Sequence, residues 1–131
     1  MSISVAMAEL ESAVHERGPV AYVVTVTDLG TPHVVHAEVL VGESGLVAAV
    51  GEHTARNALQ RPSVSLLYPC RRADDYSLIV DAVATVVSDT GGRRLLLMAT
   101  RAVLHRPAPA PDPTTAPCSS DCVELAVRPP R

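Results

Sequence analysis

The chain has 131 residues, of which 47% are hydrophobic, and a formal net charge of −3. This length predicts a single domain over residues 1–131, and the acidic balance argues against the phosphate-driven contacts that bind nucleic acid. No hydrophobic run approaches the roughly 20 residues of a membrane span, and the N-terminal segment lacks the basic start and apolar core of a signal peptide. We therefore expect a cytoplasmic protein with neither a nucleic-acid nor a membrane partner.

The first predicted element is a helix over residues 4–17, which Gly18 and Pro19 end. From there the hydrophobic residues alternate with a period of two, which predicts strands, and the Val-rich composition without Phe or Trp favours them too. Residues 93–105 are long enough for a helix, but the flanking turn and the preceding strands favour a bent strand with a break near Thr100. The predicted strands cover residues 20–27, 32–41, 46–50, 63–68, 76–87 and 93–105. Six or seven strands at this spacing predict a mainly β fold, a sandwich or a barrel.

The C-terminal part is predicted to be a Pro-rich connector at 106–121 followed by a short final strand at 122–127. The connector ends in a C-x3-C pair, Cys118 and Cys122, and no Cys or His pair completes a zinc set beside it. Free thiols are the expectation for this pair, and a redox pair or metal clip is the alternative.

The histidines do not form a metal-binding pattern. His33 and His36 are three residues apart on one strand, so they point to opposite faces, and His53 has no partner at ligand spacing. We expect no metal site. The chain also has no G-x-S-x-G, G-x-G-x-x-G or P-loop motif, so no catalytic side-chain triad is expected. The strand at 20–27 is hydrophobic on both faces, which predicts a covering second subunit and therefore a homodimer.

The segment GEHTARNALQRP, residues 51–62, is the main candidate for a ligand site. It follows a strand that ends at Val50, Gly51 permits a close turn, and a short helix is expected to begin near Thr54. A helix N-terminus offers free N–H groups and a positive dipole end to a phosphate, and Arg56 can bind an oxyanion in a bidentate way. The alternative interpretation is a capped surface helix with an exposed arginine.

The order of these elements and two stretches, YVVTVTDLGTPHVVHAEV and TARNALQRPSVSLL, resemble the flavin-binding split-barrel family typified by pyridoxamine phosphate oxidase. The resemblance covers about residues 5–106 and includes TRAVLHRPA at 100–108. It implies a six- to seven-stranded antiparallel split β-barrel with an N-terminal helix and one or more short helices. It also implies a homodimer that holds FMN, or a deazaflavin such as the 8-hydroxy-deazaflavin coenzyme, in a cleft between subunits.

The resemblance also implies which residues hold the cofactor. Backbone atoms of the second strand would face the isoalloxazine ring, at Val34, Val35 and His36. The phosphate would lie against Val50, Gly51, His53, Thr54, Arg56 and Asn57. His33 stands where many members of the family have Arg, and Thr54 stands where many have Lys. Two missing charge-assisted hydrogen bonds would lower FMN affinity by about one to several powers of ten.

Three hypotheses about function follow from the resemblance. The first is a flavin- or deazaflavin-dependent oxidoreductase acting on a small-molecule substrate, in which the cofactor supplies the chemistry. His36 is the candidate side chain near the ring, as a hydrogen-bonding group or proton donor, and the alternative is an ordinary strand histidine. The second is a non-catalytic module that binds a flavin, haem or another planar ligand. The third is an interaction domain whose cleft holds no ligand.

Overall fold

The computed structural model describes residues 1–108 of the chain. The predicted connector at 106–121 lies almost entirely outside these residues, and the predicted final strand at 122–127 and the Cys118–Cys122 pair lie wholly outside them. Within residues 1–108, no helix is both long enough and apolar enough to cross a membrane.

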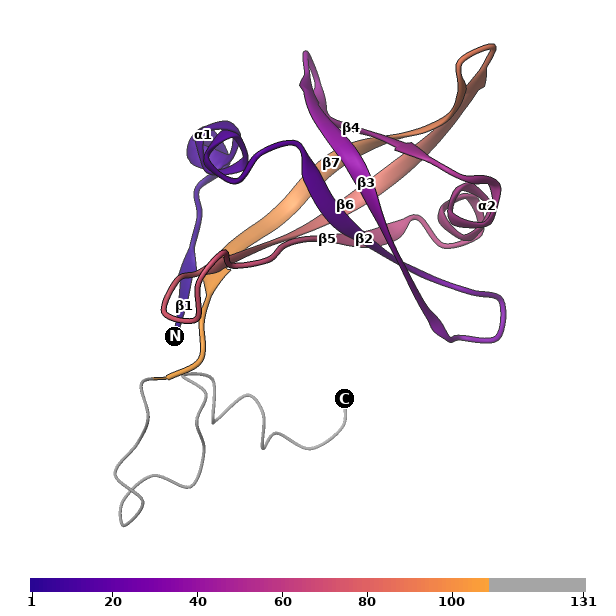
Figure 1. The fold of residues 1–131 in the computed structure, drawn as a ribbon. Helices are drawn as coiled ribbons and strands as arrows, with labels where there is room; N and C mark the ends of the chain where they lie inside the picture. Colours follow the sequence, from indigo (N-terminus) through magenta and orange to yellow (C-terminus); the bar gives the residue numbers. More distant parts are fainter. Residues whose placement is uncertain (109–131) are drawn as a thin grey trace.

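Seven antiparallel strands form one sheet, and six of them close into a barrel (Figure 1). The strands are β1 (Ser2–Ser4), β2 (Val20–Val26), β3 (Pro32–Gly42), β4 (Gly45–Val50), β5 (Ser63–Tyr68), β6 (Ser77–Asp89) and β7 (Gly92–His105). Their order is β1-β7-β4-β3-β2-β5-β6, and pairing between β6 and β7 closes the barrel. The expected mainly β, six- to seven-stranded split-barrel fold is confirmed.

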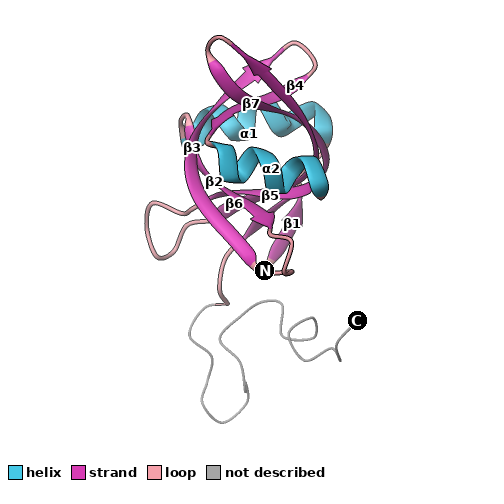
Figure 2. Cartoon of the chain, turned by 90° about the vertical axis from the view of Figure 1, so that its right-hand side faces the viewer, coloured by secondary structure: helices cyan, strands magenta, loops and turns pink. Residues whose placement is uncertain are grey.

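Two helices cover the open ends of the barrel. Figures 1 and 2 show α2 (Glu52–Gln60) across one end and α1 (Met7–Arg17) across the other. The helix α2 contributes Ala55 and Ala58 to the buried side chains, and α1 contributes Leu10 and Val14. The placement of α2 matters for function, because its first turn lies where β3 and β4 meet the hairpin that joins β6 to β7.

The N-terminal segment differs from its prediction, because the helix begins at Met7 rather than at residue 4. Residues Ser2–Ser4 form β1 instead and pair with Val103–His105 at the end of β7. That pairing joins residues about 100 positions apart, so a local hydrophobic pattern could not reveal it. The predicted end of the helix is confirmed: Gly18 caps it with a φ of 86°, a conformation that favours glycine.

The barrel interior is filled by branched and small side chains, as the period-two pattern predicted. Buried side chains alternate with exposed or half-buried ones along β5 and along most of β6. The one large aromatic ring among the buried hydrophobic residues is that of Tyr68. On β2, Ala21 and Val23 face the interior while Val20 and Tyr22 remain exposed, so the outer face of this strand is hydrophobic as well.

The predicted break in the last strand is also confirmed. In the ladder between β6 and β7, Asp81 pairs with Arg101 and Ala82 pairs with Ala99, so Thr100 is left over as a β-bulge. The bulge moves the buried positions of β7 from Leu95 and Leu97 on one side of it to Ala102 on the other. The hydroxyl of Thr100 donates to the carbonyl oxygen of Asp81 at 3.2 Å and holds the bulge in place.

Candidate functional site

A cavity of about 490 Å³ lies where β3, the end of β4 and the first turn of α2 converge. Seven of the ten predicted site residues line it: His33, Val35, His36, Val50, Gly51, His53 and Thr54. These residues come from two segments that are about 14 positions apart in sequence, joined by the β3–β4 hairpin and the β4–α2 junction. The structure therefore brings the predicted ring-facing strand and the predicted phosphate-facing helix to one cavity.

The positive end of α2 opens into this cavity. The helix begins at Glu52, two residues before the predicted start, and its N-cap is Gly51 in an ordinary extended conformation with a φ of −82°. In the described part of the chain no side chain caps the helix, and the first backbone hydrogen bond of the helix runs from the N–H of Ala55 to the carbonyl of Gly51. The N–H groups of the first turn have no partner inside the helix and can bind an anion.

Thr54 adds a hydroxyl to the same place. The residue is 2% exposed and lines the cavity, and its hydroxyl makes no hydrogen bond within residues 1–108. The Oγ1 atom keeps some accessible surface at the cavity, so a ligand atom there can accept a hydrogen bond from Thr54. Because Gly51 is the N-cap, Thr54 does not cap the helix, and its hydroxyl is available to a ligand.

The cation at the cavity is Arg93, which the sequence did not point to. Arg93 pairs with Val50 in the ladder between β4 and β7, which places its side chain at the mouth of the cavity with Gly91 and Gly92 of the β6–β7 turn. Its guanidinium Nη2 lies 3.4 Å from Oε1 of Glu52, and both side chains are partly exposed. Finding Arg93 from sequence would have required the strand register of β4 against β7.

Three of the predicted site residues do not line the cavity. Val34 lies on the outer face of β3, where it is exposed. Arg56 is exposed on α2 and makes no ion pair within the described residues. Asn57 is 8% exposed, and its side-chain Nδ2 donates to Oγ1 of Thr25 at 3.1 Å. The only asparagine of the chain therefore attaches α2 to β2 in the interior.

The three histidines give the cavity hydrogen-bonding groups on two sides. His33 pairs with the buried Thr25 across β2, and its Nδ1 is buried without a hydrogen-bond partner in the part of the chain that the structure describes. His36 lies on the outer face, where its ring makes an edge contact with Tyr22 at a centroid distance of 6.4 Å. No group of three or more His, Cys, Asp or Glu side chains within residues 1–108 is arranged to hold a metal ion.

His36 also borders a second cavity, of about 390 Å³, on the outer side of β2. This cavity has hydrophobic walls from Val20 and Tyr22, and its charged residues are Arg17 and Arg71. Because the two cavities share His36, a ligand that extends from α2 across β3 would reach the mouth of the second cavity.

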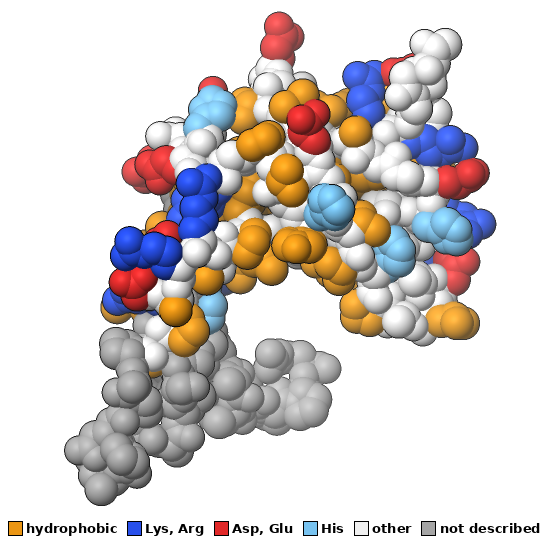
Figure 3. All heavy atoms as spheres, viewed as in Figure 1, with side chains coloured by type: hydrophobic (Ala, Val, Ile, Leu, Met, Phe, Trp, Pro, Cys, Tyr) orange, Lys and Arg blue, Asp and Glu red, His pale blue; other side chains and the backbone are white. Residues whose placement is uncertain are grey.

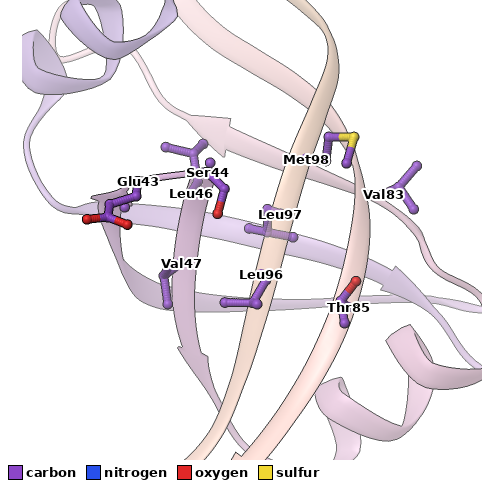
Figure 4. A pocket seen from close by; sticks show the side chains of 11 residues that line it. Glu43, Ser44, Leu46, Val47, Val83, Thr85, Leu96, Leu97 and Met98 are labelled. Atoms are coloured by element: carbon purple, nitrogen blue, oxygen red, sulfur yellow. The ribbon is translucent and has the colours of Figure 1, made fainter.

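The outer surface of the barrel near these cavities is hydrophobic. Figure 3 shows hydrophobic side chains gathered over a hollowed face, with histidines toward one side of it. We call the exposed residues Val20, Tyr22, Val34 and Leu40 the outer β2–β3 face. A separate shallow cavity of about 230 Å³ lies next to it on the outside of β4, β6 and β7, lined by Val47, Val83, Leu96 and Met98 (Figure 4). Leu40 pairs with Val47 across the β3–β4 ladder, so the two hydrophobic regions are continuous.

No family model matches the chain. Two uncharacterized mycobacterial proteins, Mb0449c from Mycobacterium bovis and MT0457 from Mycobacterium tuberculosis, are each 36% identical over 124 residues, covering 83% of this chain and 87% of theirs.

Several solved structures have a similar fold at low sequence identity. A candidate pyridoxamine 5'-phosphate oxidase from Listeria innocua superposes with a TM-score of 0.64 at 12% identity, covering 76% of this chain and 98% of that one. An F420 reductase gives a TM-score of 0.56 at 16% identity, covering 66% and 90%. HutZ, the haem storage protein of Vibrio cholerae, gives 0.59 at 18% identity, covering 74% and 92%.

Proposed function

The chain belongs to the family of the mycobacterial proteins Mb0449c and MT0457 and has the split-barrel fold of pyridoxamine phosphate oxidase-like proteins, and from this premise we propose that it binds a flavin or deazaflavin cofactor. The proposed site is the cavity between β3 and the first turn of α2. With the cofactor bound, the protein would be an oxidoreductase that acts on a small molecule.

The observation that carries this proposal is the donor set at one end of the cavity. The N–H groups of the first turn of α2, the unpartnered hydroxyl of Thr54 and the guanidinium of Arg93 all border the same space. These groups suit the phosphate of a flavin-type cofactor. The backbone of β3 at Val35 and His36 forms the adjoining wall, where a planar ring would lie.

The side chains of the cavity would bind and orient the cofactor and exclude water. A flavin or deazaflavin supplies the hydride chemistry when it is bound. Within residues 1–108 the cavity is lined by no Ser, Cys, Lys or Tyr that could act as a nucleophile. His36 is the side chain that can donate a hydrogen bond at the edge of the ring, because it lies between the two cavities.

We also propose that the protein is a homodimer whose subunits meet through the outer β2–β3 face. This face carries large exposed hydrophobic residues, and a monomeric protein rarely leaves a continuous patch of this kind in water. The face includes Tyr22, which contacts His36 at the edge of the cavity. A second subunit on this face would close the proposed cofactor cavity from the solvent side.

A second candidate function is binding of haem or a flavin without catalysis. It is favoured by the three imidazoles of His33, His36 and His53 at one cavity, since imidazole is a ligand of haem iron. HutZ, which shares the fold, is a haem storage protein.

Titration of the purified full-length protein with FMN, riboflavin, F420 and haem tests these proposals. We expect a flavin or F420 to bind with a dissociation constant of about 10 μM or lower, which corresponds to a binding free energy of about 7 kcal/mol. Binding is measured by the change in the absorbance band of the added compound. Haem binding with a new Soret band and no binding of the others would instead support the second function. If none of the four compounds binds at about 100 μM, a free energy near 5 kcal/mol, both proposals are wrong.

A further inference from the structure

The charges at the proposed phosphate site nearly cancel. Among the lining residues that lie within 1–108, Arg93 carries the one positive charge that is present at all ordinary pH values, and Glu52 carries the one carboxylate. They lie 3.4 Å apart and form an ion pair. The neighbouring ion pair between Arg94 and Asp89 in the β6–β7 hairpin adds no net charge to this region.

Glu52 already places a negative charge at the positive end of α2. It is the first residue of the helix, where a carboxylate interacts favourably with the helix dipole. A phosphate that binds to the same N–H groups must therefore share them with this carboxylate or displace it. The repulsion from Glu52 grows in proportion to the charge of the incoming phosphate. A hydrogen bond from Thr54 or from the backbone can form with a singly or a doubly charged phosphate.

We propose that this charge pattern sets the phosphate chemistry of the ligand: Arg93 binds the phosphate, and Glu52 offsets the preference that Arg93 and the helix dipole would otherwise give to a doubly charged phosphomonoester over a singly charged phosphodiester. The proposal deepens the proposed function and rests on it for the identity of the ligand. A deazaflavin coenzyme of the F420 type carries a phosphodiester, whereas FMN carries a phosphomonoester. The site would then accept the phosphodiester about as well as the phosphomonoester.

The proposal does not require that the cofactor be known, because two small phosphates carry the same distinction. Monomethyl phosphate is a dianion at pH 8, above its second pKa of about 6, and dimethyl phosphate is a monoanion. Each is titrated into the full-length protein at pH 8 and constant ionic strength while NMR follows the backbone amides of Glu52, His53 and Thr54. The experiment is repeated with Glu52→Gln and Arg93→Ala.

Matched controls are available for both substitutions. Arg94 is the next residue along β7, is also paired with an acid, and does not line the cavity, so Arg94→Ala controls for Arg93→Ala. Glu11 is an exposed residue of α1, so Glu11→Gln controls for the loss of one surface carboxylate.

In the wild-type protein we expect dimethyl phosphate to bind within about threefold of monomethyl phosphate, despite having half the charge. Glu52→Gln should raise the affinity for monomethyl phosphate by about tenfold and that for dimethyl phosphate by about threefold. Arg93→Ala should weaken dimethyl phosphate binding by about tenfold and monomethyl phosphate binding by more, and neither control should change either affinity.

The proposal is overturned if the wild-type protein already binds monomethyl phosphate more than about threefold more tightly than dimethyl phosphate. It is also overturned if Glu52→Gln leaves the ratio of the two affinities unchanged, or if neither phosphate shifts the three amides. Failure of the proposed function looks different: the phosphates then behave as expected, while FMN, riboflavin and F420 all fail to bind.

Discussion

Replacing Asn57 with Ala should destabilise the protein and weaken the proposed cofactor site at the same time. Asn57 is buried in α2, and its side-chain amide donates to Oγ1 of Thr25, which is fully buried on β2. This hydrogen bond attaches the helix to the barrel three residues after Thr54, the buried residue at the cavity. Its loss leaves the Thr25 hydroxyl without the amide that now binds it and allows α2 to shift.

The expected size follows from the geometry. A hydrogen bond of 3.1 Å between neutral groups contributes about 0.5–1.5 kcal/mol, and a buried hydroxyl left without a partner costs about 1–3 kcal/mol. We therefore expect Asn57→Ala to lower the free energy of unfolding by about 2–3 kcal/mol. Thr25→Val removes the same hydrogen bond from the other side, so the double variant should cost less than the sum of the two, with a coupling of about 1–2 kcal/mol.

The assay is urea unfolding followed by circular dichroism for the wild type, the two single variants and the double variant. Gln60→Ala, at the exposed end of the same helix, is the matched control and should change stability by less than about 0.5 kcal/mol. A loss below about 0.5 kcal/mol for Asn57→Ala, or strictly additive effects in the double variant, would refute this reasoning. An unchanged stability together with a large loss of cofactor binding would mean that Asn57 contacts the ligand directly.

Four further predictions follow from other parts of the structure. Gly45→Ala should destabilise the protein by more than about 1 kcal/mol in urea unfolding, because a Cβ there would lie 2.5 Å from a backbone carbonyl oxygen of β7. Gly51→Ala is the control and should not destabilise the protein to this extent, because the space around its Cα is open. Burial raises the pKa of Tyr68 to about 12, whereas an unfolded tyrosine loses its proton near pH 10, so the free energy of unfolding should fall as the pH rises from about 10 to 12. Urea unfolding in this range should show a smaller fall for Tyr68→Phe, and at pH 7 this variant should be at least as stable as the wild type. Arg56→Ala should change FMN or F420 affinity by less than about threefold in a titration, unlike Arg93→Ala. Leu40→Glu should convert the proposed dimer to a monomer in light scattering, and Leu29→Glu, in the exposed β2–β3 turn, should not.

Most of the barrel could be predicted from local sequence, because the longer strands show alternating hydrophobic residues and the hairpin turns at Gly30, Gly45 and Gly92 contain glycine. The range expected for β5, residues 63–68, matches the structure at both ends, and the break near Thr100 is the observed bulge. The exception is β1, because three residues are too few to show a hydrophobic alternation and their partners on β7 lie about 100 positions away in sequence.

The candidate site could be predicted only in part, for two physical reasons. The segments that are close in sequence, β3 and the first turn of α2, line one cavity. Arg93 was missed because only the register of β7 against β4 brings it beside Val50. On α2 the helical period sets the outcome: Thr54 and Asn57, three apart, are both buried, while Arg56 between them is exposed.

A crystal structure of the protein with whichever flavin or deazaflavin binds most tightly tests the central claim most directly. We predict that the phosphate lies against the first turn of α2, within hydrogen-bonding distance of the Thr54 hydroxyl and the Arg93 guanidinium, and that the ring lies along β3 beside His36. A ligand seated instead in the shallow cavity lined by Val47 and Met98, or bound without contact to Thr54 and Arg93, would contradict the account.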